Sequence, residues 1–147
     1  MLRRVEPDDI AIFFDAQDDP VAVEMAAVPS RDRAAHREHW ARILADESVI
    51  VRTILEGGQV VGYVTSFIVN GERNVGYWLG RPHWGRGYAT RALVEFLADV
   101  RERPLHARVA EHNPASLRIL AKCGFTAVGE EQPDGDPVKA IILRLAA

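Results

Sequence analysis

The stretch HWGRGYATRA, residues 83–92, places two glycines directly before the start of an expected helix. Glycine has no Cβ, so the backbone at Gly85 and Gly87 can adopt positive φ and bring its N–H groups close to another molecule. A helix beginning near Ala89 adds unpaired N–H groups and about half a positive charge. Three arginines surround this turn: Arg81, Arg86 and Arg91. The turn is therefore predicted to bind a diphosphate, and the alternative is a plain loop whose glycines serve only the turn.

The residues outside this turn predict a mixed α/β (α+β) fold, with a sheet of about six or seven strands that is mostly antiparallel. Alternating apolar residues predict strands at 2–5, at 49–56 and 59–69 around a Gly57-Gly58 hairpin turn, and at 73–80, 105–112, 125–131 and 138–145. Helical spacing and capping residues predict about four helices: from Pro7, after Ser30 with Trp40, Ile43 and Leu44 buried, at 89–100, and from Asn113 to Gly124.

The composition is that of an ordinary globular protein, with 147 residues, 48% apolar and 27% charged, and a formal net charge of −3. This length suits one domain over residues 1–147. The negative charge gives no general attraction for nucleic acid. No apolar run approaches the roughly 20 residues that cross a bilayer, and the first residues lack an apolar signal segment, so we expect a cytoplasmic protein without a membrane partner. Cys123 is the only cysteine, so neither a disulfide nor a cysteine-based zinc site is expected.

Two nucleotide-binding motifs are similar to the turn and are disfavoured. A P-loop would end in Gly-Lys-Ser/Thr, and the sequence GYAT lacks the lysine. A G-x-G-x-x-G dinucleotide motif would need glycine at Thr90 and would follow the first strand of a βαβ unit.

Two stretches together resemble the GNAT superfamily of N-acetyltransferases, and most of all its RimJ/RimL-like branch. They are YWLGRPHWGRGYATRAL (77–93) and EHNPASLRILAKCGF (111–125). The first is similar to the family signature Q/R-x-x-G-x-G/A, with Trp84, Gly87 and Ala89 at its defined positions. Tryptophan departs from the general pattern there, but it is familiar in the RimJ/RimL-like branch. The second is similar to the run N-x-x-S-x-x-x-L-x-x-x-G-F.

The resemblance implies a GNAT fold that splays two neighbouring parallel strands, here 74–80 and 105–112, around the pantetheine arm of acetyl-CoA. It implies no metal. The residues expected to contact this cosubstrate are Leu79, Trp84, Gly85, Arg86, Gly87, Tyr88, Ala89, Thr90, Asn113 and Ser116. Asn113 is also expected to cap the following helix, and Ser116 has the alternative of being an ordinary first-turn serine.

The catalytic groups that the resemblance implies are only partly present. The backbone N–H of Leu79 is expected to stabilise the oxyanion of the thioester, and the branch suggests Ser116 as general acid. The tyrosine acid of many relatives is replaced by Leu120, and the strand glutamate of some is replaced by Arg108. Glu111 and His112, at the end of a strand, are candidate bases, with a water relay as the alternative.

The expected function is direct transfer of an acetyl group to a primary amine, such as a peptide N-terminus, a polyamine or another small cation. Two acidic loops predict a cationic acceptor, although surface loops are often acidic: Asp15, Asp18, Asp19 and Glu24 in one, and Glu130, Glu131, Asp134 and Asp136 in the other. The alternative is an acyl-CoA-binding sensor without activity. A monomer and a homodimer are both compatible with the sequence.

Overall fold

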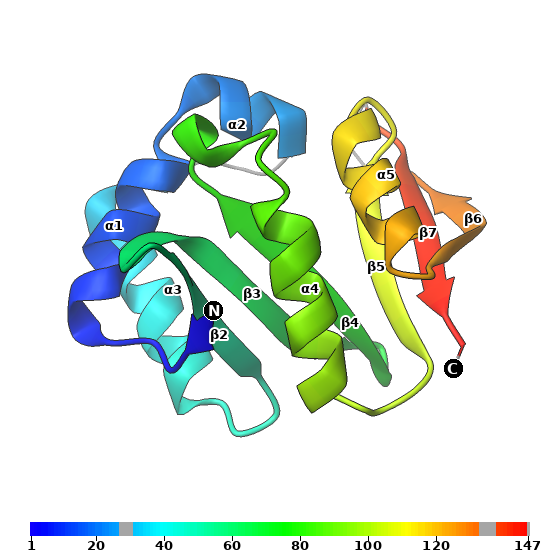
Figure 1. Ribbon diagram of the computed structural model, residues 1–147, viewed down its shortest axis with the longest axis horizontal. Coiled ribbons are helices and arrows are strands. Elements are labelled where there is room, and N and C mark those ends of the chain that lie inside the picture. The colour runs from blue at the N-terminus through cyan, green and yellow to red at the C-terminus, as the bar shows by residue number, and fades with distance from the viewer. Residues whose placement is uncertain (27–30, 133–137, 147) are drawn as a thin grey trace.

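The computed structural model describes residues 1–26, 31–132 and 138–146. In these parts of the chain, seven strands form one sheet in the order β1-β2-β3-β4-β5-β7-β6 (Figure 1). The strands are β1 (Leu2–Arg3), β2 (Ile50–Glu56), β3 (Gln59–Val69), β4 (Glu72–Leu79), β5 (Leu105–Ala110), β6 (Thr126–Glu131) and β7 (Ala140–Leu145). All neighbours pair antiparallel except β4 and β5, which are parallel. The predicted mixed, mostly antiparallel sheet is confirmed.

Five α-helices lie in the described residues: α1 (Pro7–Gln17), α2 (Pro20–Ala26), α3 (Arg33–Ala45), α4 (Tyr88–Asp99) and α5 (Pro114–Lys122). A short 3-10 helix, Arg81–His83, links β4 to the glycine turn. In Figure 1, α4 and α5 lie in front of the sheet, and α2 lies beside the turn that precedes α4. None of the helices in these parts of the chain is both long enough and apolar enough to cross a membrane.

Helix α4 packs one apolar face on the sheet because its apolar residues recur at helical spacing. Ala89, Ala92, Leu93 and Phe96 are buried in a core that includes Val64 and Leu79 of the sheet. The helix ends at Asp99, and the Val100 N–H closes it by donating to the Phe96 carbonyl at 2.8 Å. This packing fixes the position of the preceding glycine turn relative to the end of β4.

A second cluster holds α1 and α3 together on the N-terminal half of the sheet. Phe13 of α1 and Trp40 of α3 are each 1% exposed, and their ring centroids lie 4.9 Å apart. Tyr63 of β3 packs against both rings. Tyr63 packs against α1 and α3, whereas the neighbouring Val64 packs in the core beneath α4. Helices therefore cover both faces of the first half of the sheet.

Two expectations about the N-terminal region need correction, and one helix was missed. The first strand is only Leu2–Arg3, because Val5 leaves the sheet and packs into the Phe13–Trp40 cluster. Leu44 is 48% exposed, not buried. The helix α2 was not predicted, and it turns out to border the site.

Candidate active site

The parallel strands β4 and β5 pair at one end and separate at the other. Within the described strands their only backbone pairing is Asn74 with His106, near the start of each strand. The buried Asn74 side chain reinforces this end, since its Oδ1 accepts from Arg108 at 3.2 Å. The predicted splay is therefore present, and it opens toward Leu79 (Figure 1).

The register of β3 against β4 turns the N–H of Leu79 into this opening. Gly80 donates to the Val61 carbonyl at 3.0 Å, which makes Val61 and Gly80 a hydrogen-bonded pair. Hydrogen-bonded and non-hydrogen-bonded pairs alternate along antiparallel strands, so the next pair, Gly62 with Leu79, points its backbone groups away from each other. The N–H of Leu79 therefore faces the β5 side, where the strands have separated.

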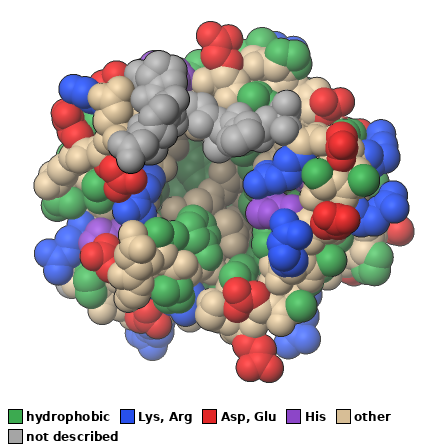
Figure 2. Space-filling view, turned by 180° about the vertical axis from the view of Figure 1, so that it is seen from behind, with side chains coloured by type: hydrophobic (Ala, Val, Ile, Leu, Met, Phe, Trp, Pro, Cys, Tyr) green, Lys and Arg blue, Asp and Glu red, His purple; other side chains and the backbone are tan. Residues whose placement is uncertain are grey.

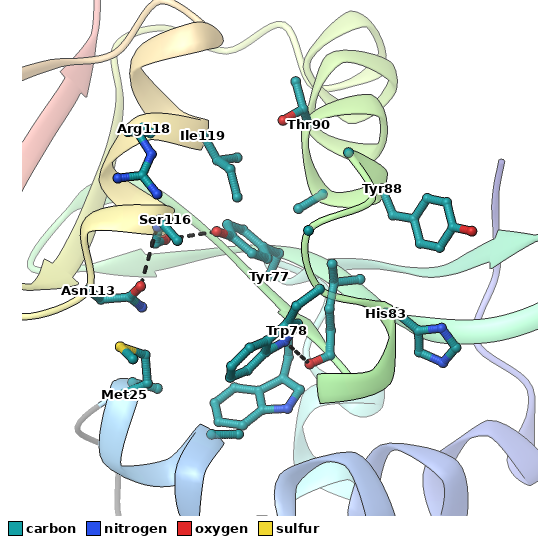
Figure 3. A pocket seen from close by; sticks show the side chains of 18 of the residues that line it. Met25, Tyr77, Trp78, His83, Tyr88, Thr90, Asn113, Ser116, Arg118 and Ile119 are labelled. Atoms are coloured by element: carbon teal, nitrogen blue, oxygen red, sulfur yellow. Dashed lines mark hydrogen bonds between the residues drawn. The ribbon is translucent and has the colours of Figure 1, made fainter.

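A cavity of about 470 Å³ occupies the splayed end (Figure 3). Its lining comes from α2, β4, the glycine turn, α4 and α5. It includes nine of the ten residues expected to contact acetyl-CoA, all except Arg86: Leu79, Trp84, Gly85, Gly87, Tyr88, Ala89, Thr90, Asn113 and Ser116. Segments far apart in the sequence thus meet around one space.

The start of α4 presents free N–H groups at this cavity. Gly87 is the N-cap, in the left-handed region with φ 78°, and it offers no side chain to bond those groups. Gly85 also has positive φ, and a Cβ added at Gly85 or Gly87 would meet nothing within 4 Å. The glycines therefore shape the turn and leave open space in front of the helix, which is the arrangement that binds anions.

Two of the three arginines expected around the turn are engaged elsewhere. Arg81 pairs with Asp19 at 2.9 Å, and Arg91 pairs with Glu56 at 3.2 Å. Arg86 is exposed and has no ion-pair partner among the residues that the structure describes. On α5, Arg118 and Lys122 line the cavity, and they are the basic groups that the sequence argument missed.

A hydrogen-bonded chain crosses the cavity from β4 to α5. The Tyr77 hydroxyl donates to Ser116 Oγ at 2.8 Å, and the Ser116 N–H donates to Asn113 Oδ1 at 3.3 Å (Figure 3). The predicted helix cap at Asn113 is therefore confirmed. Burial raises the pKa of Tyr77, although its bond to Ser116 acts in the opposite direction. A hydroxyl network thus lies opposite the N-terminus of α4.

The two candidate bases lie at the end of β5 and do not line this cavity. The ring of His112 bonds through Nε2 to the Glu24 carbonyl on α2 at 2.7 Å. A carbonyl only accepts, so in the neutral ring Nε2 carries the hydrogen and Nδ1 keeps its lone pair. Glu111 is exposed. Cys123 is half-buried, and burial raises the pKa of its thiol, which makes it a poor nucleophile.

The cavity reaches both faces of the sheet. Side chains of successive strand residues point to opposite faces. Tyr77 and Leu79 belong to the core beneath α4 and α5, whereas the indole of the intervening Trp78 donates to the Ala16 carbonyl of α1 at 3.3 Å. All three line the cavity, which therefore passes through the opening between β4 and β5. Figure 2, a view from behind, shows the surface hollowed near its middle, with hydrophobic side chains in the hollow.

This geometry suits a long thioester. The free N–H groups of α4 match a diphosphate, the separated strands leave room for an extended arm, and Leu79 and Ser116 line the same cavity. Among the described residues no group of three His, Cys, Asp or Glu side chains could hold a metal ion. The cavity lining and the start of α4 fit acyl transfer from a thioester.

Comparison with known proteins identifies the family. The acetyltransferase (GNAT) domain family matches residues 1–126, so the chain belongs to it and is an N-acetyltransferase of GNAT type. The uncharacterized N-acetyltransferase p20 of Bacillus licheniformis is 28% identical over 87% of this chain and 79% of its own length. The SPbeta prophage-derived uncharacterized N-acetyltransferase YokL of Bacillus subtilis (strain 168) is 25% identical over 88% of this chain and 77% of its own.

Solved structures share the fold. Aminoglycoside acetyltransferase AAC(6')-Ib in complex with coenzyme A has a TM-score of 0.80 at 22% identity, covering 99% of this chain and 94% of that one. Spermidine N-acetyltransferase from Vibrio cholerae, in complex with CoA and spermine, has a TM-score of 0.81 at 16% identity, covering 99% and 94%. The predicted GNAT fold is confirmed.

Proposed function

We propose that this protein transfers an acetyl group from acetyl-CoA directly to a small cationic amine, in a ternary complex, as a member of the RimJ/RimL-like branch. The observation that carries the proposal is the cavity at the splayed end of β4 and β5. It is lined by the start of α4, with its free N–H groups, and by Leu79, whose N–H faces the gap between the strands. Trp84 at the signature position and Ser116 on α5 support the branch.

The acetyl-CoA diphosphate binds the N–H groups at the start of α4, with Arg86 beside it. The pantetheine arm then runs along the gap, where Asn113 and the backbone of β4 contact it. The acceptor enters from the opposite face of the sheet, since the cavity opens to both faces. A ternary complex forms in this way without an acetyl-enzyme.

When the amine attacks, the thioester oxygen gains negative charge, and the Leu79 N–H stabilises it. Loss of one such donor costs about 10²–10³ in rate. Ser116 donates a hydrogen bond to the departing sulfur. Glu111 or His112 takes the proton from the amine through water, because neither side chain lines the cavity. For His112, the free Nδ1 is the accepting atom.

The acceptor is proposed to be a cation, and the acidic residues support this only in part. Four of those expected in loops lie in helices or a strand instead: Asp15 in α1, Glu24 in α2, and Glu130 and Glu131 in β6. Asp19 and Glu131 are already paired, with Arg81 and Arg108. Glu130 lies 3.8 Å from Lys139, whereas Asp15, Asp18 and Glu24 are exposed. Asp134 and Asp136 lie outside the described residues. The names of two structural neighbours, an aminoglycoside and a spermidine acetyltransferase, favour a polycationic amine.

The test is thiol release when purified protein is mixed with acetyl-CoA and a panel of amines. The proposal expects turnover with at least one polyamine, aminoglycoside or peptide N-terminus, and none without an amine. Binding of acetyl-CoA with no release across the whole panel would favour a sensor and contradict the proposal.

A further inference from the structure

A tyrosine hydroxyl to which the mechanism above gives no role lies in the cavity. Tyr77 precedes Leu79 by two residues on β4, so its side chain lies on the same face of the sheet as that of Leu79. Its hydroxyl reaches across to α5 and donates to Ser116 Oγ at 2.8 Å (Figure 3). Because burial raises its pKa, Tyr77 remains protonated at neutral pH and stays a donor.

The hydrogen bonds of Ser116 determine where its own hydrogen can point. A serine hydroxyl has one hydrogen and two acceptor lone pairs. Oγ already accepts the hydrogen of Tyr77, so the Ser116 hydrogen is directed elsewhere. The backbone N–H of Ser116 is held by Asn113 Oδ1, which fixes the serine from its other side. Ser116 is therefore oriented by one residue from β4 and one from its own helix.

We propose that Tyr77 is a positioning residue for acyl transfer, which turns the hydroxyl hydrogen of Ser116 toward the departing sulfur. The inference rests on the proposed function of Ser116. In the step concerned, the C–N bond forms, the C–S bond breaks, and its electron pair leaves on sulfur. The Ser116 O–H stabilises that charge by a hydrogen bond, while the surplus proton on nitrogen passes to the base or to solvent.

A double-mutant cycle tests the inference. Tyr77→Phe keeps the ring and removes only the hydroxyl, so we expect kcat to fall about five- to tenfold, with the KM for acetyl-CoA within about twofold. Ser116→Ala should lower kcat at least as much. In the double variant kcat should equal that of Ser116→Ala, because Tyr77 acts through Ser116.

Tyr63→Phe is the matched control. The Tyr63 hydroxyl also has a side-chain partner, accepting from Gln17 Nε2 at 3.0 Å, and Tyr63 does not line the cavity. Its loss should leave kcat unchanged. Losses of kcat that multiply in the double variant, or full kcat in Tyr77→Phe, would overturn the role of Tyr77 while wild-type thiol release still supports the proposed function. Failure of the wild type to bind acetyl-CoA or release thiol would overturn both.

Discussion

The indole N–H of Trp84 donates to the carbonyl oxygen of Leu79 at 3.0 Å. This bond ties the turn before α4 to the last residue of β4. The residue whose N–H is proposed to stabilise the oxyanion is thus bonded, through its carbonyl, to the turn that is proposed to bind the diphosphate. The Trp84 side chain therefore links the proposed oxyanion site to the proposed diphosphate site.

Trp84→Phe should therefore impair use of acetyl-CoA without unfolding the protein. Phenylalanine keeps an aromatic ring and loses the donor, so we expect kcat/KM for acetyl-CoA to fall about three- to tenfold. Trp40→Phe is the control, since the indole of Trp40 packs in the cluster with Phe13 and does not line the cavity. Steady-state kinetics with acetyl-CoA varied would measure both. An equal loss in the two variants would argue against the connection.

The stability of the protein should depend on pH through Asp9. Burial raises the pKa of this carboxylate, but Arg3, the Glu6 N–H and the Thr53 hydroxyl together bring the pKa below its ordinary value. A folded-state pKa below the unfolded one gives stability that is complete above about pH 4 and is lost as the pH falls through the folded pKa.

Asp9→Asn should accordingly cost roughly 3 kcal/mol of unfolding free energy at pH 7, because it leaves Arg3 without its buried partner. The difference from wild type should shrink as the pH drops below about 4. Urea unfolding of both proteins at pH 7 and pH 3 would measure it. A difference that stays the same at both pH values would show that the charge of Asp9 contributes nothing.

Turnover of the acceptor should depend on salt. A cationic amine drawn by exposed acidic side chains loses that attraction when the Debye length shrinks from about 10 Å at 0.1 M salt to about 3 Å at 1 M. We expect the KM for the amine to rise severalfold over this range, while the KM for a neutral amine stays nearly constant. A best acceptor that is anionic, or insensitive to salt, would refute the cationic proposal.

Most of the sheet could be predicted from the sequence, because strand alternation and glycine turns are local signals. The correction at Leu44 shows where local reasoning fails. Successive residues of an α-helix are rotated by about 100° around its axis. Leu44 therefore lies about 80° around the helix from His36, whereas Ile43 lies about 20° from it. The buried face of α3 follows His36, Trp40 and Ile43 and leaves Leu44 exposed.

The backbone part of the candidate site could also be predicted, whereas its side-chain partners could not. Gly85 and Gly87 are conformational signals that a sequence shows directly. The pairing of Arg81 with Asp19 joins residues 62 positions apart, and the bond from Tyr77 to Ser116 joins residues 39 positions apart. Such contacts depend on the tertiary fold, which brings together segments that are far apart in the sequence. Side chains alternate between the two faces along β4, which places Tyr77 on the same face as Leu79. This signal in the sequence could have identified Tyr77 as a residue of the site.

The central claim is that the start of α4 binds the diphosphate of coenzyme A. Gly87→Asp and Gly71→Asp provide a matched pair to test it. Gly87 and Gly71 have φ of +78° and +79°, and a Cβ at either position would meet nothing within 4 Å. Gly71, however, lies in the β3–β4 turn, at the opposite end of β4 from the cavity. Both variants should lose about 1–2 kcal/mol from the strained backbone.

The most direct measurement is the melting temperature of wild type and the two variants with and without acetyl-CoA. At about 100 times its dissociation constant, acetyl-CoA adds about 2.7 kcal/mol, or several degrees. The account predicts this shift in wild type and in Gly71→Asp, and its loss in Gly87→Asp. A full shift in Gly87→Asp would contradict it, because the diphosphate would then bind elsewhere.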